Sequence, residues 1–68
     1  MSIFAERLLE LRKERGISQA KLAKAIDVSR SLICYWETAR TEPTASNIVK
    51  IADYFNVTSD YLLGRSDY

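Results

Sequence analysis

The sequence predicts an all-α fold in which five short helices pack into one compact domain. Apolar residues recur at three- and four-residue spacing along the whole chain, and the alternation typical of a half-buried strand is absent. A serine or threonine precedes each apolar stretch and can cap the helix that follows. The 68 residues, 47% hydrophobic and 28% charged, suit one small globular domain, which we place at residues 1–68.

Two helices are expected in the first half of the chain. The first lies between Ser2, which can cap it, and Gly16, which can end it in the left-handed conformation. The second lies between the capping Ser18 and a short turn at Asp27. Each helix has one apolar face at helical spacing. The inward residues of these two faces are Phe4, Leu8, Leu11, Leu22, Ala23 and Ile26.

Three more helices are expected in the second half. The third covers residues 29–37 and is capped by its first residue, a serine. After a polar loop, Thr44 caps a fourth helix, and Asn56 ends it because asparagine tolerates the left-handed conformation. Thr58 caps a short fifth helix, so the last two helices cover about residues 45–63.

The stretch over residues 18–37 has the order helix, short turn, helix. Two helices joined this tightly cross steeply, and Ala23 supplies the small side chain needed where they touch. On a helical wheel of the second helix, Ile33 and Trp36 point to the core. The outward face consists of Arg30, Ser31, Cys34 and Tyr35. This is a helix-turn-helix arrangement, whose second helix can enter the major groove of DNA.

The outward face has the chemistry that base recognition needs. Arg30 can bond guanine bidentately, Ser31 can bond any base, and Tyr35 can reach a phosphate or contact a thymine methyl group. The face carries no acid, which phosphates would repel. Spacing alone also allows simpler interpretations. Arg30 could be an ordinary surface arginine, Tyr35 could pack over its own helix, and Gln19 could be a solvated first-turn residue.

The chain resembles the Cro/CI-type (XRE-like) helix-turn-helix family of bacterial and phage transcription regulators. The similarity covers about residues 3–64 and is strongest in the helix-turn-helix stretch. The segments that carry it are residues 7–12, 17–33, 36–37, 47–52 and 60–64. The resemblance implies a lambda-repressor-like fold and a sequence-specific regulator of transcription, with repression as the expected activity. It implies double-stranded operator DNA as the partner.

The resemblance also implies roles for single residues. Arg30, Ser31 and Tyr35 match positions that contact base edges. Positions that contact the DNA backbone are matched by Gln19, Ser29, Thr38, Arg40 and Thr41. Arg12 and Glu37 match a pair that locks the first helix to the third, and we expect a bidentate ion pair there.

Two positions depart from the family pattern. Asp27 stands where the family usually has glycine in the turn, and aspartate adopts the left-handed conformation at modest cost. Thr38 and Ala39 replace a frequent Asn-Gly pair after the third helix. The sequence therefore predicts the geometry of that loop less well than it predicts the helices. The same holds for the contacts of Thr38 and Arg40, which depend on the loop.

A homodimer is expected because one helix reads only roughly four or five base pairs. Two copies would present two such helices about 34 Å apart to a palindromic or pseudo-palindromic operator. Apolar and aromatic residues near the C-terminus suit an isologous interface between the copies. The candidate interface residues are Tyr54, Tyr61 and Leu63.

Composition argues against several other functions. The chain has no histidine and one cysteine, Cys34, so neither an enzyme nor a metal site is expected. No cofactor and no small-molecule ligand are indicated. With no apolar run of membrane-spanning length and no signal peptide, we expect a cytoplasmic protein.

The charge balance leaves one alternative open. Ten basic and nine acidic residues give a net charge of +1, less basic than many nucleic-acid-binding proteins. A protein-interaction module, such as an antitoxin-like adaptor, could be built on the same fold. DNA binding that depends on Arg30 and Gln19 would distinguish the regulator from the adaptor.

Overall fold

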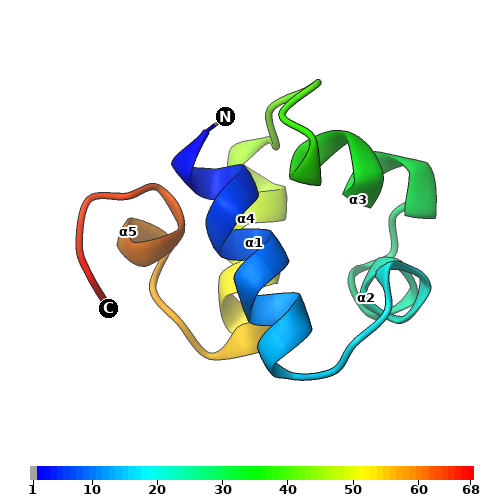
Figure 1. Ribbon diagram of the computed structural model, residues 1–68, viewed down its shortest axis with the longest axis horizontal. Coiled ribbons are helices and arrows are strands. Elements are labelled where there is room, and N and C mark those ends of the chain that lie inside the picture. Colours follow the sequence, from blue (N-terminus) through cyan, green and yellow to red (C-terminus); the bar gives the residue numbers. More distant parts are fainter. Residues whose placement is uncertain (1) are drawn as a thin grey trace.

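A computed structural model describes residues 2–68, which form five α-helices. Figure 1 shows α1 in front of α4 in the middle of the view, α2 and α3 on one side of them, and α5 with the C-terminus on the other. Within residues 2–68, no helix has both the length and the apolar character needed to cross a membrane. The helices are α1 Ile3–Glu14, α2 Gln19–Ile26, α3 Arg30–Glu37, α4 Ala45–Phe55 and α5 Ser59–Leu62.

Each helix begins at the hydroxyl residue that the sequence predicted. The side-chain oxygen of each cap accepts a hydrogen bond from the backbone N–H three residues later, at 3.0–3.2 Å. This bond satisfies one of the N–H groups that a helix start leaves without a partner. The caps are Ser2, Ser18, Ser29, Thr44 and Thr58.

Each helix is also followed by a residue in the left-handed conformation. Gly16, Asp27 and Asn56 take this role as predicted, with φ between 57° and 63°. Gly64 follows α5, and a side chain there would lie 2.7 Å from Ile3, so this position also needs glycine for space. Ala39 follows α3 with φ 60°, a conformation that the sequence did not predict for an alanine.

The core lies between α1, α4 and α3 and is closed by α2 and α5. Trp36, Phe55 and Leu8 are its largest fully buried side chains. Phe4 packs edge-on against Trp36, with ring centroids 6.2 Å apart. The inward faces predicted for the first two helices are confirmed, and α4 contributes Ile51, Ala52 and Phe55 to the core. This core holds α3 by its apolar side and leaves its polar side in solvent.

The left-handed alanine leads to a prediction about stability. Replacing Ala39 by glycine is expected to raise the free energy of unfolding by about 0.5–1 kcal/mol, because glycine has no Cβ to clash in this conformation. Chemical denaturation measures the change. Ala25 is the matched control, since it lies exposed inside α2. Ala25→Gly should destabilise the chain by about 1 kcal/mol. Loss of stability in both variants would contradict the conformation described for Ala39.

Candidate nucleic-acid interface

The turn between α2 and α3 sets the angle at which α3 leaves the core. Asp27 adopts φ 61° and ψ 51°, and the N–H of Val28 donates to the carbonyl of Ala23 at 2.9 Å. Leu22 and Ile33 are fully buried at the junction of the two helices. The departure from glycine at Asp27 is therefore accommodated, because the left-handed turn forms with aspartate in place.

The outward face of α3 is polar and exposed. Arg30 and Ser31 lie on its first turn and Tyr35 one turn later, and all three are exposed. Tyr35 keeps 40% of its surface in solvent. Ile33 and Trp36 point the other way and are buried. The structure thus brings the three predicted base-contacting residues together on one face.

Arg12 and Glu37 form the predicted ion pair. Arg12 Nε donates to Glu37 Oε2 at 2.6 Å, and Nη2 donates to Oε1 at 2.9 Å. Arg12 Nη1 also donates to the carbonyl of Ile17 at 2.9 Å. Glu37 is only 5% exposed. One guanidinium thereby ties α1 both to α3 and to the loop before α2, with the parallel bonds typical of a strong arginine–carboxylate pair.

The ion pair has a clear effect on its arginine. The hydrogen bonds to Glu37, helped by the attraction of its negative charge, raise the pKa of Arg12 above its ordinary value, although burial opposes the shift. A raised pKa in the folded state stabilises the fold at every pH below the ordinary arginine pKa. Titration of Arg12 itself should therefore not change this contribution over the range in which proteins are usually studied.

Gln19 joins the same cluster. Its Nε2 donates one hydrogen bond to Glu37 Oε1 at 3.0 Å, which fixes the amide at the start of α2 beside the end of α3. The second N–H of that amide group remains to donate to another acceptor. The sequence analysis did not predict this bond, because the two residues are 18 positions apart and meet only when α2 and α3 cross.

The other predicted backbone-contacting residues surround the end and the start of α3. Ser29 accepts a hydrogen bond from Leu32 N, which leaves its hydroxyl proton to donate. Thr38 instead donates its hydroxyl to the carbonyl of Cys34 at 2.9 Å. A phosphate offers only acceptors, so Thr38 must release that carbonyl before it can donate to one. Thr41 is exposed in the following loop.

Arg40 lies against Tyr35. Its guanidinium carbon is 5.0 Å from the centre of the tyrosine ring, and its backbone N–H donates to the Tyr35 carbonyl at 2.8 Å. A residue predicted to contact the DNA backbone therefore packs on one predicted to contact bases. The sequence analysis missed this contact, because it depends on the left-handed backbone of Ala39 that turns the chain back over the helix.

The predicted interface residues line three different hollows: Leu63 faces the loop after α3, Tyr54 lies beside the end of α2, and Tyr61 lies beside α1. Tyr54 and Tyr61 are half-buried and pack against the core, whereas Leu63 is 47% exposed. Arg7 was missed by the sequence analysis. It lies over the Tyr61 ring and donates to the carbonyls of Tyr61 and Ser66, so it holds the C-terminal residues against α1.

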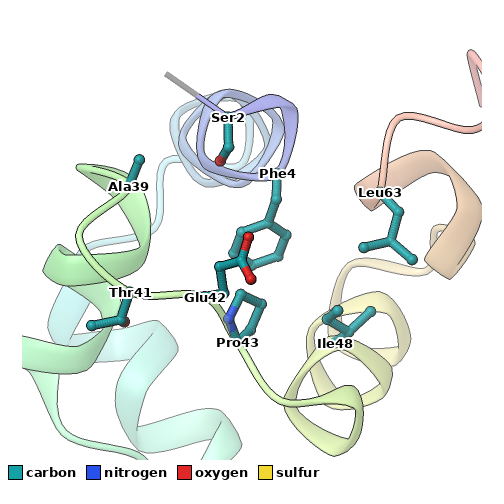
Figure 2. A pocket seen from close by; sticks show the side chains of 8 residues that line it. All are labelled: Ser2, Phe4, Ala39, Thr41, Glu42, Pro43, Ile48 and Leu63. Carbon is teal, nitrogen blue, oxygen red and sulfur yellow. The ribbon is translucent and has the colours of Figure 1, made fainter.

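A mainly apolar hollow of about 210 Å³ lies beside Leu63. Figure 2 shows Leu63 and Ile48 on one side of this hollow and Thr41 on the other, with Phe4 and Glu42 between them. Its volume is below the roughly 300–1,000 Å³ typical of small-molecule sites. Within residues 2–68, no group of three or more side chains is placed to hold a metal ion.

Similarity to known proteins decides the family. A sequence model described as helix-turn-helix matches residues 8–62. The chain belongs to this helix-turn-helix family. It is 37% identical over 64 residues to the HTH-type transcriptional activator BcrR of Enterococcus faecalis, and 36% identical over 61 residues to Repressor protein C2 of Salmonella phage P22. These matches cover 94% and 90% of this helix-turn-helix chain, but only 31% and 28% of the two relatives.

Solved structures show the same arrangement of helices. The P22 c2 repressor, crystallised in complex with a synthetic operator, matches with a TM-score of 0.89 and 33% identity, over 97% of this chain and 100% of that one. The restriction-modification controller protein C.AhdI of Aeromonas hydrophila matches with a TM-score of 0.82 and 32% identity, over 88% and 91%. The predicted five-helix, repressor-like fold and the predicted family are both confirmed.

Proposed function

We propose that this helix-turn-helix chain binds operator DNA in a sequence-specific manner and regulates transcription, with repression as its activity. The observation that carries the proposal is the exposed, acid-free face of α3 on a fold that matches a repressor solved in complex with operator DNA. Helix α3 would lie in the major groove, where each base pair presents a distinct pattern of donors and acceptors.

The proposed contacts divide into two groups. Arg30, Ser31 and Tyr35 contact base edges from the outward face of α3. A ring of residues around this face contacts phosphates and so sets the position of the helix in the groove. These backbone-contacting residues are Gln19, Ser29, Thr38, Arg40 and Thr41. Lys21 and Lys24 are exposed on the neighbouring helix α2 and add positive charge to the helix-turn-helix.

We propose that the chain binds DNA as a homodimer through the surface that carries Leu63. Each copy has both an exposed Leu63 and an apolar hollow next to it. Around a two-fold axis, the leucine of each copy can therefore enter the hollow of the other copy. Arg65 follows two residues later and Glu42 lines the hollow, which gives the copies complementary charges.

Selection of bound duplexes from a random DNA pool, at a stated salt concentration, tests the proposed function. The expected result is one enriched motif made of two inverted half-sites, about one helical turn apart. Arg30→Ala should change the enriched sequence, since that residue is proposed to contact a base. Failure of the wild-type chain to enrich any motif would contradict the proposal. It would favour the adaptor-like alternative, whose binding would ignore Arg30 and Gln19.

The dimer leads to a separate prediction. Leu63→Lys is expected to shift the chain toward monomer and to weaken operator binding, because it places a charge in an apolar contact. Sedimentation velocity over a range of concentrations measures the change. Val49→Lys is the matched control, since Val49 is 52% exposed but lies on α4, outside the hollow. A wild-type chain that stays monomeric at high concentration and protects a single half-site would contradict the dimer.

A further inference from the structure

We propose that Tyr35 positions Arg40 for DNA, so that the two side chains bind as one unit and not as two independent contacts. The inference rests on the proposed DNA-binding function and adds a positioning role for Tyr35 to its proposed contact with a base. It is carried by the packing of Arg40 on the tyrosine ring and by the backbone that brings the two residues together.

The distance between the two groups is that of a cation–π contact. The Arg40 guanidinium carbon lies 5.0 Å from the ring centre of Tyr35, inside the roughly 6 Å limit for such contacts. The arginine occupies one face of the ring. Because Tyr35 is still 40% exposed, part of the ring remains accessible to DNA while the arginine is in place.

The backbone after α3 accounts for this placement. The Arg40 N–H donates to the carbonyl of Tyr35 at 2.8 Å, and Ala39 adopts φ 60° to make this bond. The Thr38 N–H donates to the carbonyl of Cys34 at 3.0 Å. These bonds close a tight turn at the helix end and return the backbone of Arg40 to Tyr35, so the arginine side chain can reach the ring.

The charge of Arg40 is available for a phosphate. Within residues 2–68, the ion pairs join Arg7 to Asp67 and Arg12 to Glu37, and Arg40 takes part in neither. A free arginine side chain loses much of its freedom when it clamps a phosphate. An arginine already held over a ring loses less, and the contact with the ring remains compatible with a phosphate on its other side.

If the two side chains bind as one unit, removing the Tyr35 ring also removes part of the contribution of Arg40 to operator binding. We expect Arg40→Ala to weaken operator binding about two- to fivefold less in a Tyr35→Leu background than in the wild-type chain, per half-site. In a Tyr35→Phe background, Arg40→Ala should have its full effect, because phenylalanine keeps the aromatic face. A tyrosine that acted only through its hydroxyl would give the same Arg40→Ala effect in both backgrounds, because neither phenylalanine nor leucine carries that group.

The first arm of the test needs no DNA. In the NMR spectrum of the free chain, the Arg40 side-chain protons are expected upfield of their positions in the Tyr35→Leu variant, because they lie over an aromatic ring. Tyr35→Phe should preserve the upfield shift. Identical Arg40 shifts in the wild-type and Tyr35→Leu chains would overturn the proposal, whatever the chain binds.

The second arm is a double-mutant cycle on the operator obtained by selection, with Tyr35→Leu, Arg40→Ala and the double variant. Non-additive losses of the stated size support the unit, and additive losses overturn it. A control cycle pairs Arg30→Ala with Arg40→Ala. These residues lie at opposite ends of α3, whose eight residues span about 12 Å, and the two losses should be additive. If the wild-type chain binds no duplex, the proposed DNA-binding function fails and this proposal fails with it. The NMR measurement distinguishes that case, because it detects the packing of Arg40 on Tyr35 without DNA.

Discussion

Replacing Glu37 by glutamine is expected to lower the free energy of unfolding by about 3 kcal/mol or more. The carboxylate accepts three hydrogen bonds, two from Arg12 and one from Gln19, in a position that is 5% exposed. A glutamine side chain has the same shape, but its NH₂ group would face the N–H donors of Arg12 and Gln19. It would also leave the arginine without a negative partner. For a chain of this length, the loss corresponds to about 20 °C in Tm.

Thermal and chemical denaturation measure this effect, and Glu10→Gln is the matched control. Glu10 lies exposed on α1, where an isolated surface charge contributes little. The control should unfold within about 0.5 kcal/mol of the wild type. If Glu37→Gln were as stable as the wild type, the ion pair with Arg12 would be absent or fully solvated, and the link between α1 and α3 would have to be assigned to apolar packing alone.

Replacing Arg30 by alanine is expected to weaken operator binding by about 1–3 kcal/mol per half-site. The same change should relax the preference at one base pair, for which guanine is the expected base, because arginine bonds guanine bidentately. Arg30 is exposed on the first turn of α3, so its loss should leave the fold intact. Binding to a panel of operators that differ at single base pairs measures both effects.

Gln19→Ala serves as the comparison for Arg30→Ala. Its amide is proposed to hold a phosphate, and a phosphate contact carries no base identity. This variant should therefore weaken all operators by a similar factor and keep the order of preference. If Arg30→Ala left the preference profile unchanged, its assignment as a base-contacting residue would be wrong, even for a chain that still bound DNA.

The ends of the helices could be predicted because they depend on neighbouring residues. A hydroxyl side chain caps the helix that starts beside it, and Gly16, Asp27 and Asn56 tolerate the left-handed conformation that ends one. Apolar periodicity then placed Ile33 and Trp36 inside and the polar face of α3 outside. Both signals act over three or four residues, so the chain reveals them without its tertiary structure.

The Arg12–Glu37 pair was predicted by a different route. Its residues are 25 positions apart, and no local rule joins them. The resemblance to a known family supplied the pairing. The structure added the geometry and the burial on which the expected loss of stability depends.

The amino-acid sequence by itself determined the five helices, their caps and the polar face of the third, because short-range hydrogen bonding and apolar spacing settle these features. Only the tertiary structure decided what the polar side chains contact. Gln19 meets Glu37 because α2 crosses α3, and Arg40 lies over Tyr35 because Ala39 accepts an unfavourable backbone conformation. Such contacts depend on the packing of whole helices, and that packing is a collective property of the core.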